Sequence, residues 1–200
     1  MGPSTLASWA LLIARALAEK GLDAEPLFHR AGLSTSQLRD ANARYPIEAM
    51  LRLWTASVDA TGDPCFGLEV GRRWHPTTFH ALGYAAMASS TLREALAYVS
   101  RYCRTVSTGA TLRLEDRGTE VDLVFDSTAA APVADATALR MVAQSGLAAM
   151  ATLCRVARGG PLAIRRVAFA HTDAGCSSRL EEHFGCAVVF GAGRGESVAS

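Results

Sequence analysis

The sequence predicts an α+β domain, in which a helical N-terminal half is followed by a ββαβαβ segment that forms a small sheet packed with helices. Three observations lead to this prediction. Apolar residues recur at helical spacing through residues 4–106, two strand-like runs flank a turn within 111–125, and two more strand-like runs follow a long helical segment. The 200 residues suffice for one domain, 1–200, that needs no metal or disulfide to fold.

Composition excludes several classes of protein. Half of the residues are hydrophobic and 20% are charged, which excludes a disordered chain. The formal net charge of +1 argues against a protein that coats nucleic acid or binds an anionic membrane surface. No run of 18 uninterrupted apolar residues exists, so no membrane span is predicted. The five cysteines are odd in number and contain no CxxC pair, which favours reduced thiols in a cytoplasmic protein.

Cap and stop signals divide the N-terminal half into short helices. Gly21, Gly32 and Gly62 each follow an apolar stripe, as glycines after helix ends do. Thr91 and Glu94 form a capping box, in which each side chain can bond a backbone N–H at the helix start. The expected helices cover residues 4–21, 23–32, 34–45, 46–61, 65–72, 79–88 and 91–106.

Strand patterns dominate the C-terminal half. Runs at 111–115 and 121–125 flank Asp116-Arg117-Gly118 and predict a β-hairpin. A long helix is expected over 133–157, then a strand over 164–170, a short helix over 178–184 and a strand over 186–190. Turn residues follow from Gly191 with no further element, which leaves the sheet short of a partner. We therefore expect the chain to be part of a longer protein.

Catalytic and metal-binding patterns are missing from the sequence. His75 and His80 are five residues apart and cannot share a helix face, which argues against a metal site. No G-x-S-x-G nucleophile motif occurs, and Cys103 and Cys154 fall on apolar helix faces, where a thiol acts as a small hydrophobe. We therefore predict no cofactor and no enzymatic activity.

Residues 27–38 have the rhythm of a helix-turn-helix, with Gly32 in the turn. A recognition helix here would offer only Gln37, Arg39 and Arg44 to a groove before Pro46 ends it. An ordinary corner between two helices is the favoured interpretation, with direct DNA contact as the alternative.

Aromatic side chains between residues 54 and 102 form the candidate small-molecule site, because aromatic walls with a few polar groups are typical of ligand pockets. Trp54 also lies in the apolar stripe of its helix, which favours a core position. Arg101 lies opposite the apolar stripe of its helix, which indicates solvent, a second buried contact or a subunit interface. The candidate ligand-binding residues are Trp54, Trp74, Phe79, Tyr84, Arg101 and Tyr102.

Four segments together resemble the N-terminal effector domain of AraC-type transcriptional regulators, of the helical variety named arabinose-binding. They are "GLDAEPLFHRAGL", "ARYPIEAMLRLWTASVDATGDPCFGLEVG", "ALGYAAMASSTLREALAYVSRY" and "FAHTDAGCSSRLEEHFGCAVVFGA". The chain departs from the family pattern at Ala187, where proline is usual, and at Gly195 or Glu196, where asparagine is usual.

This resemblance implies a domain that senses an intracellular small molecule, such as an amino acid or related metabolite. It also implies a C-terminal DNA-binding domain with two helix-turn-helix units, absent from this chain, that binds promoter DNA. We expect a homodimer, formed by the long helix from Val133 or by the sheet edge. The effector pocket is expected between the helices of 79–106 and the sheet, with Tyr84, Arg101 and Tyr102 at or near it.

Two other functions are compatible with the pattern. Helices that lead into ββαβαβ are also similar to haem–NO-binding and vinyl-reductase-like domains, so a stand-alone small-molecule or haem-type sensor is the main alternative. No convincing axial histidine supports haem. An enzyme would need a paired acid and base within reach, and the sequence offers none.

Overall fold

The computed structural model describes residues 2–118, 120–127, 134–192 and 196–199, and it confirms the α+β fold class. The N-terminal half consists of β1 (Ser4–Leu6), α1 (Ala7–Glu19), α2 (Glu25–Ala31), the 3-10 turn η1 (Thr35–Gln37), β2 (Arg44–Pro46), α3 (Ile47–Thr61), α4 (Phe66–Gly71), η2 (Pro76–Phe79), α5 (Ala81–Met87) and α6 (Leu92–Val106). The C-terminal half consists of β3 (Thr111–Asp116), β4 (Val121–Asp126), α7 (Ala136–Arg158), β5 (Arg166–Phe169), α8 (Ser177–Phe184), β6 (Val188–Phe190) and β7 (Glu196–Ala199).

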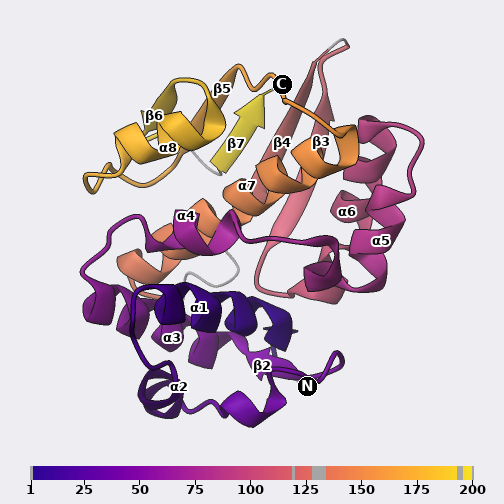
Figure 1. The fold of residues 1–200 in the computed structure, drawn as a ribbon. Helices are drawn as coiled ribbons and strands as arrows, with labels where there is room; N and C mark the ends of the chain where they lie inside the picture. Colours follow the sequence, from indigo (N-terminus) through magenta and orange to yellow (C-terminus); the bar gives the residue numbers. More distant parts are fainter. Residues whose placement is uncertain (1, 119, 128–133, 193–195, 200) are drawn as a thin grey trace.

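The long helix α7 runs through the middle of the molecule, between the N-terminal helices and the sheet (Figure 1). The Asp135 carboxylate caps it by accepting a 2.7 Å hydrogen bond from the Ala138 N–H, and Gly159 ends it in the left-handed conformation. Residue 133, where we expected the helix to begin, lies outside the described residues. Two core clusters meet on α7: Met141 belongs to the cluster of α1–α3, and Leu147 to the cluster of α5, α6 and the sheet.

Two glycines bring α4 against α7 at backbone distance. A Cβ atom added at Gly67 would lie 2.6 Å from the Met141 carbonyl oxygen, and one at Gly71 would lie 2.4 Å from the Ser145 carbonyl oxygen. Because the two glycines are four residues apart, they share one face of α4. The helices can therefore approach more closely than any side chain at these positions would permit.

Local end signals predicted most helices correctly. Gly32 and Gly62 adopt the left-handed conformation after α2 and α3. The Thr91 hydroxyl accepts a 3.1 Å hydrogen bond from the Glu94 N–H, as the capping box predicts. The Glu94 carboxylate accepts from the Ser90 N–H at 2.8 Å, one residue before the helix cap.

The sheet has five strands in the order β3-β4-β7-β5-β6, and only β5 and β6 are parallel. The predicted hairpin is confirmed, with Thr111 opposite Asp126 and Asp116 opposite Val121. The expectation that no element follows Gly191 is wrong, because β7 pairs antiparallel with both β4 and β5. A four-residue strand leaves little local signal, and its conformation depends on the two strands beside it.

A second small sheet replaces two predicted helical segments. Thr5 is extended and pairs with Tyr45, so α1 begins only at Ala7. The helix expected over 34–45 is wrong as well, because only the three-residue turn η1 forms there, capped by the Ser34 hydroxyl. A three-residue turn is too short to be a recognition helix, which leaves an ordinary corner at residues 27–38.

Across the described residues, no helix is both long and apolar enough to cross a bilayer.

Gly71→Ala should destabilise the protein, although alanine favours a helix by about 1 kcal/mol over glycine. The new Cβ would meet the Ser145 carbonyl oxygen, a backbone atom that cannot rotate away. Overpacking of this kind costs about 1–3 kcal/mol or more, so the clash should outweigh the helix preference. Urea unfolding measures the difference. Gly160→Ala, with no heavy atom within 4 Å of the added Cβ, is the control and should change stability by less than about 0.5 kcal/mol.

Candidate functional site

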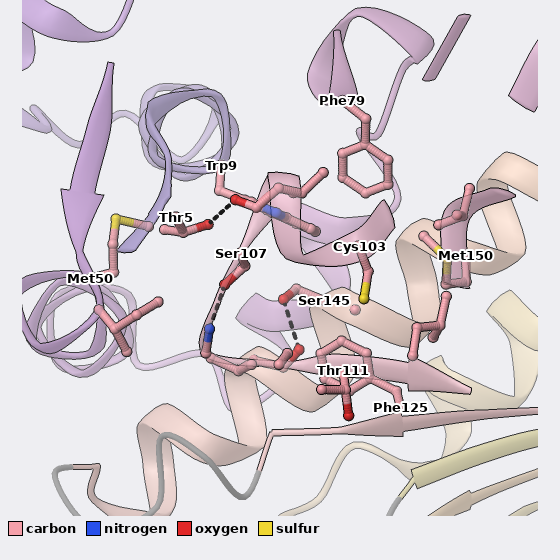
Figure 2. A pocket seen from close by; sticks show the side chains of 18 of the residues that line it. Thr5, Trp9, Met50, Phe79, Cys103, Ser107, Thr111, Phe125, Ser145 and Met150 are labelled. Carbon is pink, nitrogen blue, oxygen red and sulfur yellow. Dashed lines mark hydrogen bonds between the residues drawn. The ribbon is translucent and has the colours of Figure 1, made fainter. Parts of the chain in front are cut away.

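A cavity of about 110 Å³ lies at the centre of the molecule, where the two core clusters meet. Its walls come from β1, α1, α3, η2, α6, β3, β4 and α7 (Figure 2). Met50 and Trp54 on its wall belong to the N-terminal cluster, whereas Val99 and Met150 belong to the cluster that contains the sheet. A molecule bound here would contact both clusters at once.

Aromatic side chains form much of the cavity wall. Trp9 of α1 packs against Phe79 of η2, with 6.0 Å between ring centroids. Trp54 of α3 and Phe125 of β4 line other parts of the wall. Gly146 of α7 leaves room for the Phe125 ring, since a Cβ there would lie 2.7 Å from the ring. The wall therefore offers the apolar surface that small-molecule sites use.

Four hydroxyl groups supply most of the polar lining. The Thr5 hydroxyl donates to the Val106 carbonyl at 3.2 Å, and the Ser145 hydroxyl donates to the Val142 carbonyl at 3.0 Å. The Ser107 hydroxyl accepts from the Gly109 N–H at 3.2 Å (Figure 2). Thr111 lines the cavity too, and its hydroxyl has no hydrogen-bond partner within the described part of the chain.

No formally charged side chain occurs among the described residues that line the cavity. The cavity therefore contains no group that could form an ion pair with a ligand.

The structure divides the six candidate residues into two groups. Trp54 and Phe79 line the cavity, and the buried Trp74 packs edge-on against Phe79, with 5.4 Å between ring centroids, behind the cavity wall. Tyr84, Arg101 and Tyr102 lie outside it on the outer face of α5 and α6.

The outer group forms its own surface cluster. Tyr84 is 58% exposed and Tyr102 is 42% exposed. Tyr102 stacks on Tyr98 with 6.5 Å between ring centroids, and the Arg101 guanidinium lies 5.5 Å from the Tyr102 ring. This agrees with the prediction that Arg101 lies opposite the apolar stripe of α6.

Sequence reasoning missed the wall residues that come from strands, and it did not connect the apolar face of α7 with the cavity. Thr5 sits in β1, a strand that the sequence did not indicate. Phe125 belongs to a predicted strand, but which face of the sheet would meet a cavity depends on packing between distant segments. The apolar stripe of α6 was a usable signal, because Val99, Cys103 and Val106 from that stripe all line the cavity.

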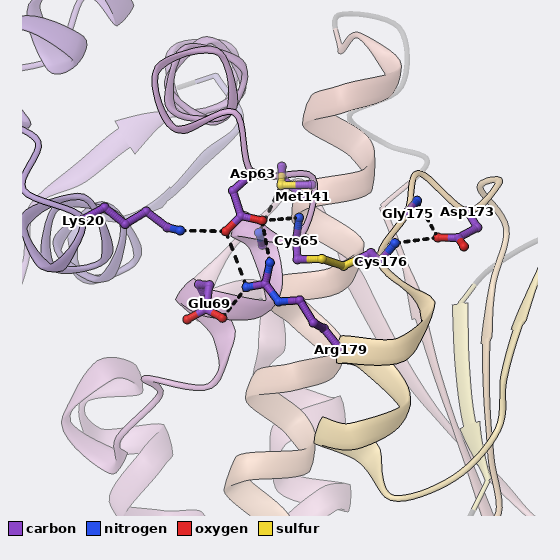
Figure 3. The surroundings of a disulfide bond; sticks show 10 residues. Lys20, Asp63, Cys65, Glu69, Met141, Asp173, Gly175, Cys176 and Arg179 are labelled. Atoms are coloured by element: carbon purple, nitrogen blue, oxygen red, sulfur yellow. Dashed lines mark hydrogen bonds and ion pairs between the residues drawn. A yellow bond between two sulfur atoms is a disulfide. The ribbon is translucent and has the colours of Figure 1, made fainter.

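A disulfide joins Cys65 to Cys176, across 111 residues of sequence, with the two Cα atoms 5.5 Å apart (Figure 3). The expectation of reduced thiols is therefore wrong for this pair. The two cysteines are the cap residues of α4 and α8, and only the tertiary fold brings these helix starts together. Cys154 is free and buried, and burial raises the pKa of its thiol to about 12, as expected for an inert thiol.

A cluster of ion pairs lies beside the disulfide. The Asp63 carboxylate accepts hydrogen bonds from Lys20 at 2.8 Å and from Arg179 at 2.7 Å. Arg179 also donates to Glu69 at 2.6 Å, so one guanidinium of α8 bridges two carboxylates of the helical half. Arg73 pairs with Glu69 and with Glu19.

The ion pairs lower the pKa values of both buried carboxyl groups. Burial alone would raise the pKa of Asp63, but the hydrogen bonds from Lys20 and Arg179 outweigh it, and the pKa lies below its ordinary value. The pKa of Glu69 is lowered in the same way, by Arg179 and its neighbours Arg72 and Arg73. With each carboxylate paired to cations, this cluster is suited to holding α4 and α8 together rather than to acid–base chemistry.

The model of the family described as "Arabinose-binding domain of AraC transcription regulator, N-term" matches residues 21–198. The chain belongs to this family, which consists of regulatory domains of transcription regulators and not of enzymes.

Comparison with solved structures supports the fold. The chain is similar to the crystal structure of the transcriptional regulator CdpR from Pseudomonas aeruginosa, with a TM-score of 0.55 and 20% sequence identity. The match covers 79% of this chain and 56% of that one, so the chain spans little more than half the length of CdpR. No curated protein sequence matches the chain.

Cys176→Ser should lower stability under oxidising conditions by about 2–5 kcal/mol, because it opens a loop of 111 residues. For a domain of this size the melting temperature should fall by roughly 5–15 °C. Differential scanning fluorimetry measures this, and a reducing agent should bring the wild type close to the variant. Cys186→Ser removes a free cysteine and is the matched control. Equal loss in both variants would contradict a role for the disulfide.

Acid should weaken the ion-pair cluster. A carboxyl group whose pKa is lowered by folding stabilises the protein above the unfolded pKa, and this stability is lost as the pH falls through the lower, folded pKa. Asp63→Asn should therefore cost about 1.5–3 kcal/mol at neutral pH, the range for hydrogen bonds to charged groups.

Urea unfolding of both proteins across a pH series measures this difference. It should remain constant above the ordinary aspartate pKa of about 4 and shrink below it. A difference that stays constant into strong acid would show that Asp63 does not act through its charge.

Proposed function

We propose that this domain senses an intracellular small-molecule effector, bound in the central cavity, for a transcription regulator of the AraC family. The observation that carries the proposal is the apolar cavity lined by both core clusters, in a chain that belongs to a family of regulatory domains. Trp54 and Phe79 contact the effector, and Trp74 holds Phe79 in place. The effector does not contact Tyr84, Arg101 or Tyr102, which lie outside the cavity.

The signal arises from differential affinity. A ligand shifts an equilibrium between two conformations only by binding one of them more tightly. A ligand that touches both core clusters stabilises the arrangement in which the two clusters fit it best. That preference is the coupling free energy available to the DNA-binding domain.

The rest of the regulator completes the proposal. Promoter DNA is bound by a C-terminal domain outside this chain, and the regulator works as a homodimer on paired half-sites in the cytoplasm. Helix α7 is buried between the other layers, which favours the sheet edge over α7 as the dimer contact. A cytoplasm keeps most thiols reduced, and there the ion pairs of Asp63 and Glu69 would hold α4 and α8 without the disulfide.

A promoter reporter driven by the full regulator tests the proposal, with a panel of amino acids, sugars and aromatic and aliphatic compounds as effectors. Val99→Phe places a ring in the cavity and should abolish the response, because it occupies the volume that the effector needs. Arg101→Ala should keep the full response, since Arg101 lies outside the cavity.

Melting curves of both variants check that they fold. A folded Val99→Phe regulator with an unchanged response would refute binding in this cavity. An Arg101→Ala regulator without any response would place the effector site on the outer face instead.

A further inference from the structure

We propose that the effector is a compact, uncharged molecule with one aromatic ring and one hydroxyl or carbonyl group, such as a phenol or an aromatic alcohol. The inference rests on the proposed function and names the chemical class of ligand that the cavity takes. It is drawn from four properties of the cavity: its size, its walls, its lack of charge and its free hydrogen-bonding groups.

Size limits the ligand to about one ring. An engineered apolar protein cavity of about 150 Å³ binds benzene, and sites for larger ligands measure about 300–1,000 Å³. The present cavity measures about 110 Å³. It therefore suits a single six-membered ring with small substituents, and a long acyl chain or a dipeptide would extend beyond it.

The walls favour an aromatic ligand over an aliphatic one. Trp9, Phe79 and Phe125 present rings to the cavity, and ring pairs gain energy beyond the area that they bury. Three sulfur-containing residues line it as well: Met50, Cys103 and Met150 (Figure 2). Sulfur makes favourable contacts with ring edges and adapts to irregular shapes.

The absence of charge excludes zwitterions and carboxylates as good ligands. A buried charge is tolerated only when it is paired, and none of the described lining residues carries a charge that could pair with it. Free amino acids such as arginine would bring at least two unpaired charges into this cavity.

The hydroxyl groups allow few polar contacts. Thr5 and Ser145 already donate their protons to backbone carbonyls, so they can only accept from a ligand. Ser107 accepts from a backbone N–H and keeps its proton to donate, and Thr111 can do both. These lining hydroxyl groups can therefore form hydrogen bonds with one hydroxyl or carbonyl group of a ligand. A pentose carries several hydroxyl groups and would leave most of them unpaired against the aromatic walls.

Binding to the purified chain, measured by thermal shift and calorimetry, tests this inference with phenol, benzyl alcohol, toluene, benzoate, arginine and arabinose as probes. We expect phenol or benzyl alcohol to raise the melting temperature by roughly 5–10 °C at one hundred times the dissociation constant. Benzoate, arginine and arabinose should bind at least tenfold more weakly than the neutral aromatic compounds.

Three variants locate the binding. Cys103→Phe fills the cavity and should abolish binding, whereas Arg101→Ala changes a residue outside the cavity and should preserve it. Thr111→Val removes one hydroxyl with little change in shape. It should weaken phenol roughly 2- to 12-fold, the value of one hydrogen bond, and leave toluene unchanged. Thr111→Val still tests where the ligand binds if Cys103→Phe does not fold.

The outcomes separate this inference from the proposed function. If no neutral aromatic compound binds, or if Thr111→Val and a folded Cys103→Phe leave phenol binding unchanged, the inferred ligand class is overturned. Binding of arginine or arabinose in that case would leave the sensing role intact with a different effector. If no class of effector changes the promoter activity in the reporter assay, that result would count against the sensing role itself.

Discussion

The close approach of α4 to α7 is the constraint on which the rest of the fold depends. Gly67 and Gly71 place the backbone of α4 against the carbonyl oxygens of Met141 and Ser145. Helix α7 can then contact the N-terminal helices on one side and the sheet on the other, and the Gly67 N–H donates to the Met141 sulfur at 3.1 Å. At its N-terminal end α4 also meets α8 through the disulfide at Cys65, so one short helix joins three parts of the molecule.

Sequence reasoning succeeded where the signal is local. Glycines in the left-handed conformation, the Thr91 cap and the alternation of the β3–β4 hairpin all lie within a few residues of the structure that they specify. It failed where partners are distant. Strand β1 depends on Arg44–Pro46, β7 depends on β4 and β5, and Cys65 meets a cysteine 111 residues away. These pairings follow from the tertiary fold, and a single sequence does not encode them in a readable pattern.

The candidate site shows the same division. Trp54 lies in an apolar stripe, and so do Val99 and Cys103, and a stripe predicts burial but not whether the buried side chain meets a void. Tyr84, Arg101 and Tyr102 combine aromatic and charged groups, which is also the composition of an exposed surface cluster, and the structure places them there. The packing of distant segments determines which residues line the same cavity. Thr5 of β1 and Phe125 of β4 are examples, because both line it although they are far apart in the sequence.

The position of the cavity explains how a small ligand could have a large effect. A ligand that fits an apolar cavity gains dispersion contacts with its lining, and the loss of such contacts costs about 24 cal/mol for each Å³ of cavity. For 110 Å³ this amounts to roughly 2–3 kcal/mol, which a fitting ligand can recover. Because the cavity wall combines residues of both core clusters, such as Trp54 and Val99, a fitting ligand gains this energy best in one relative position of the two clusters. A coupling of 1–3 kcal/mol is the usual size of an allosteric effect, so a ligand that filled this cavity would supply an energy of the size that the proposed sensing role requires.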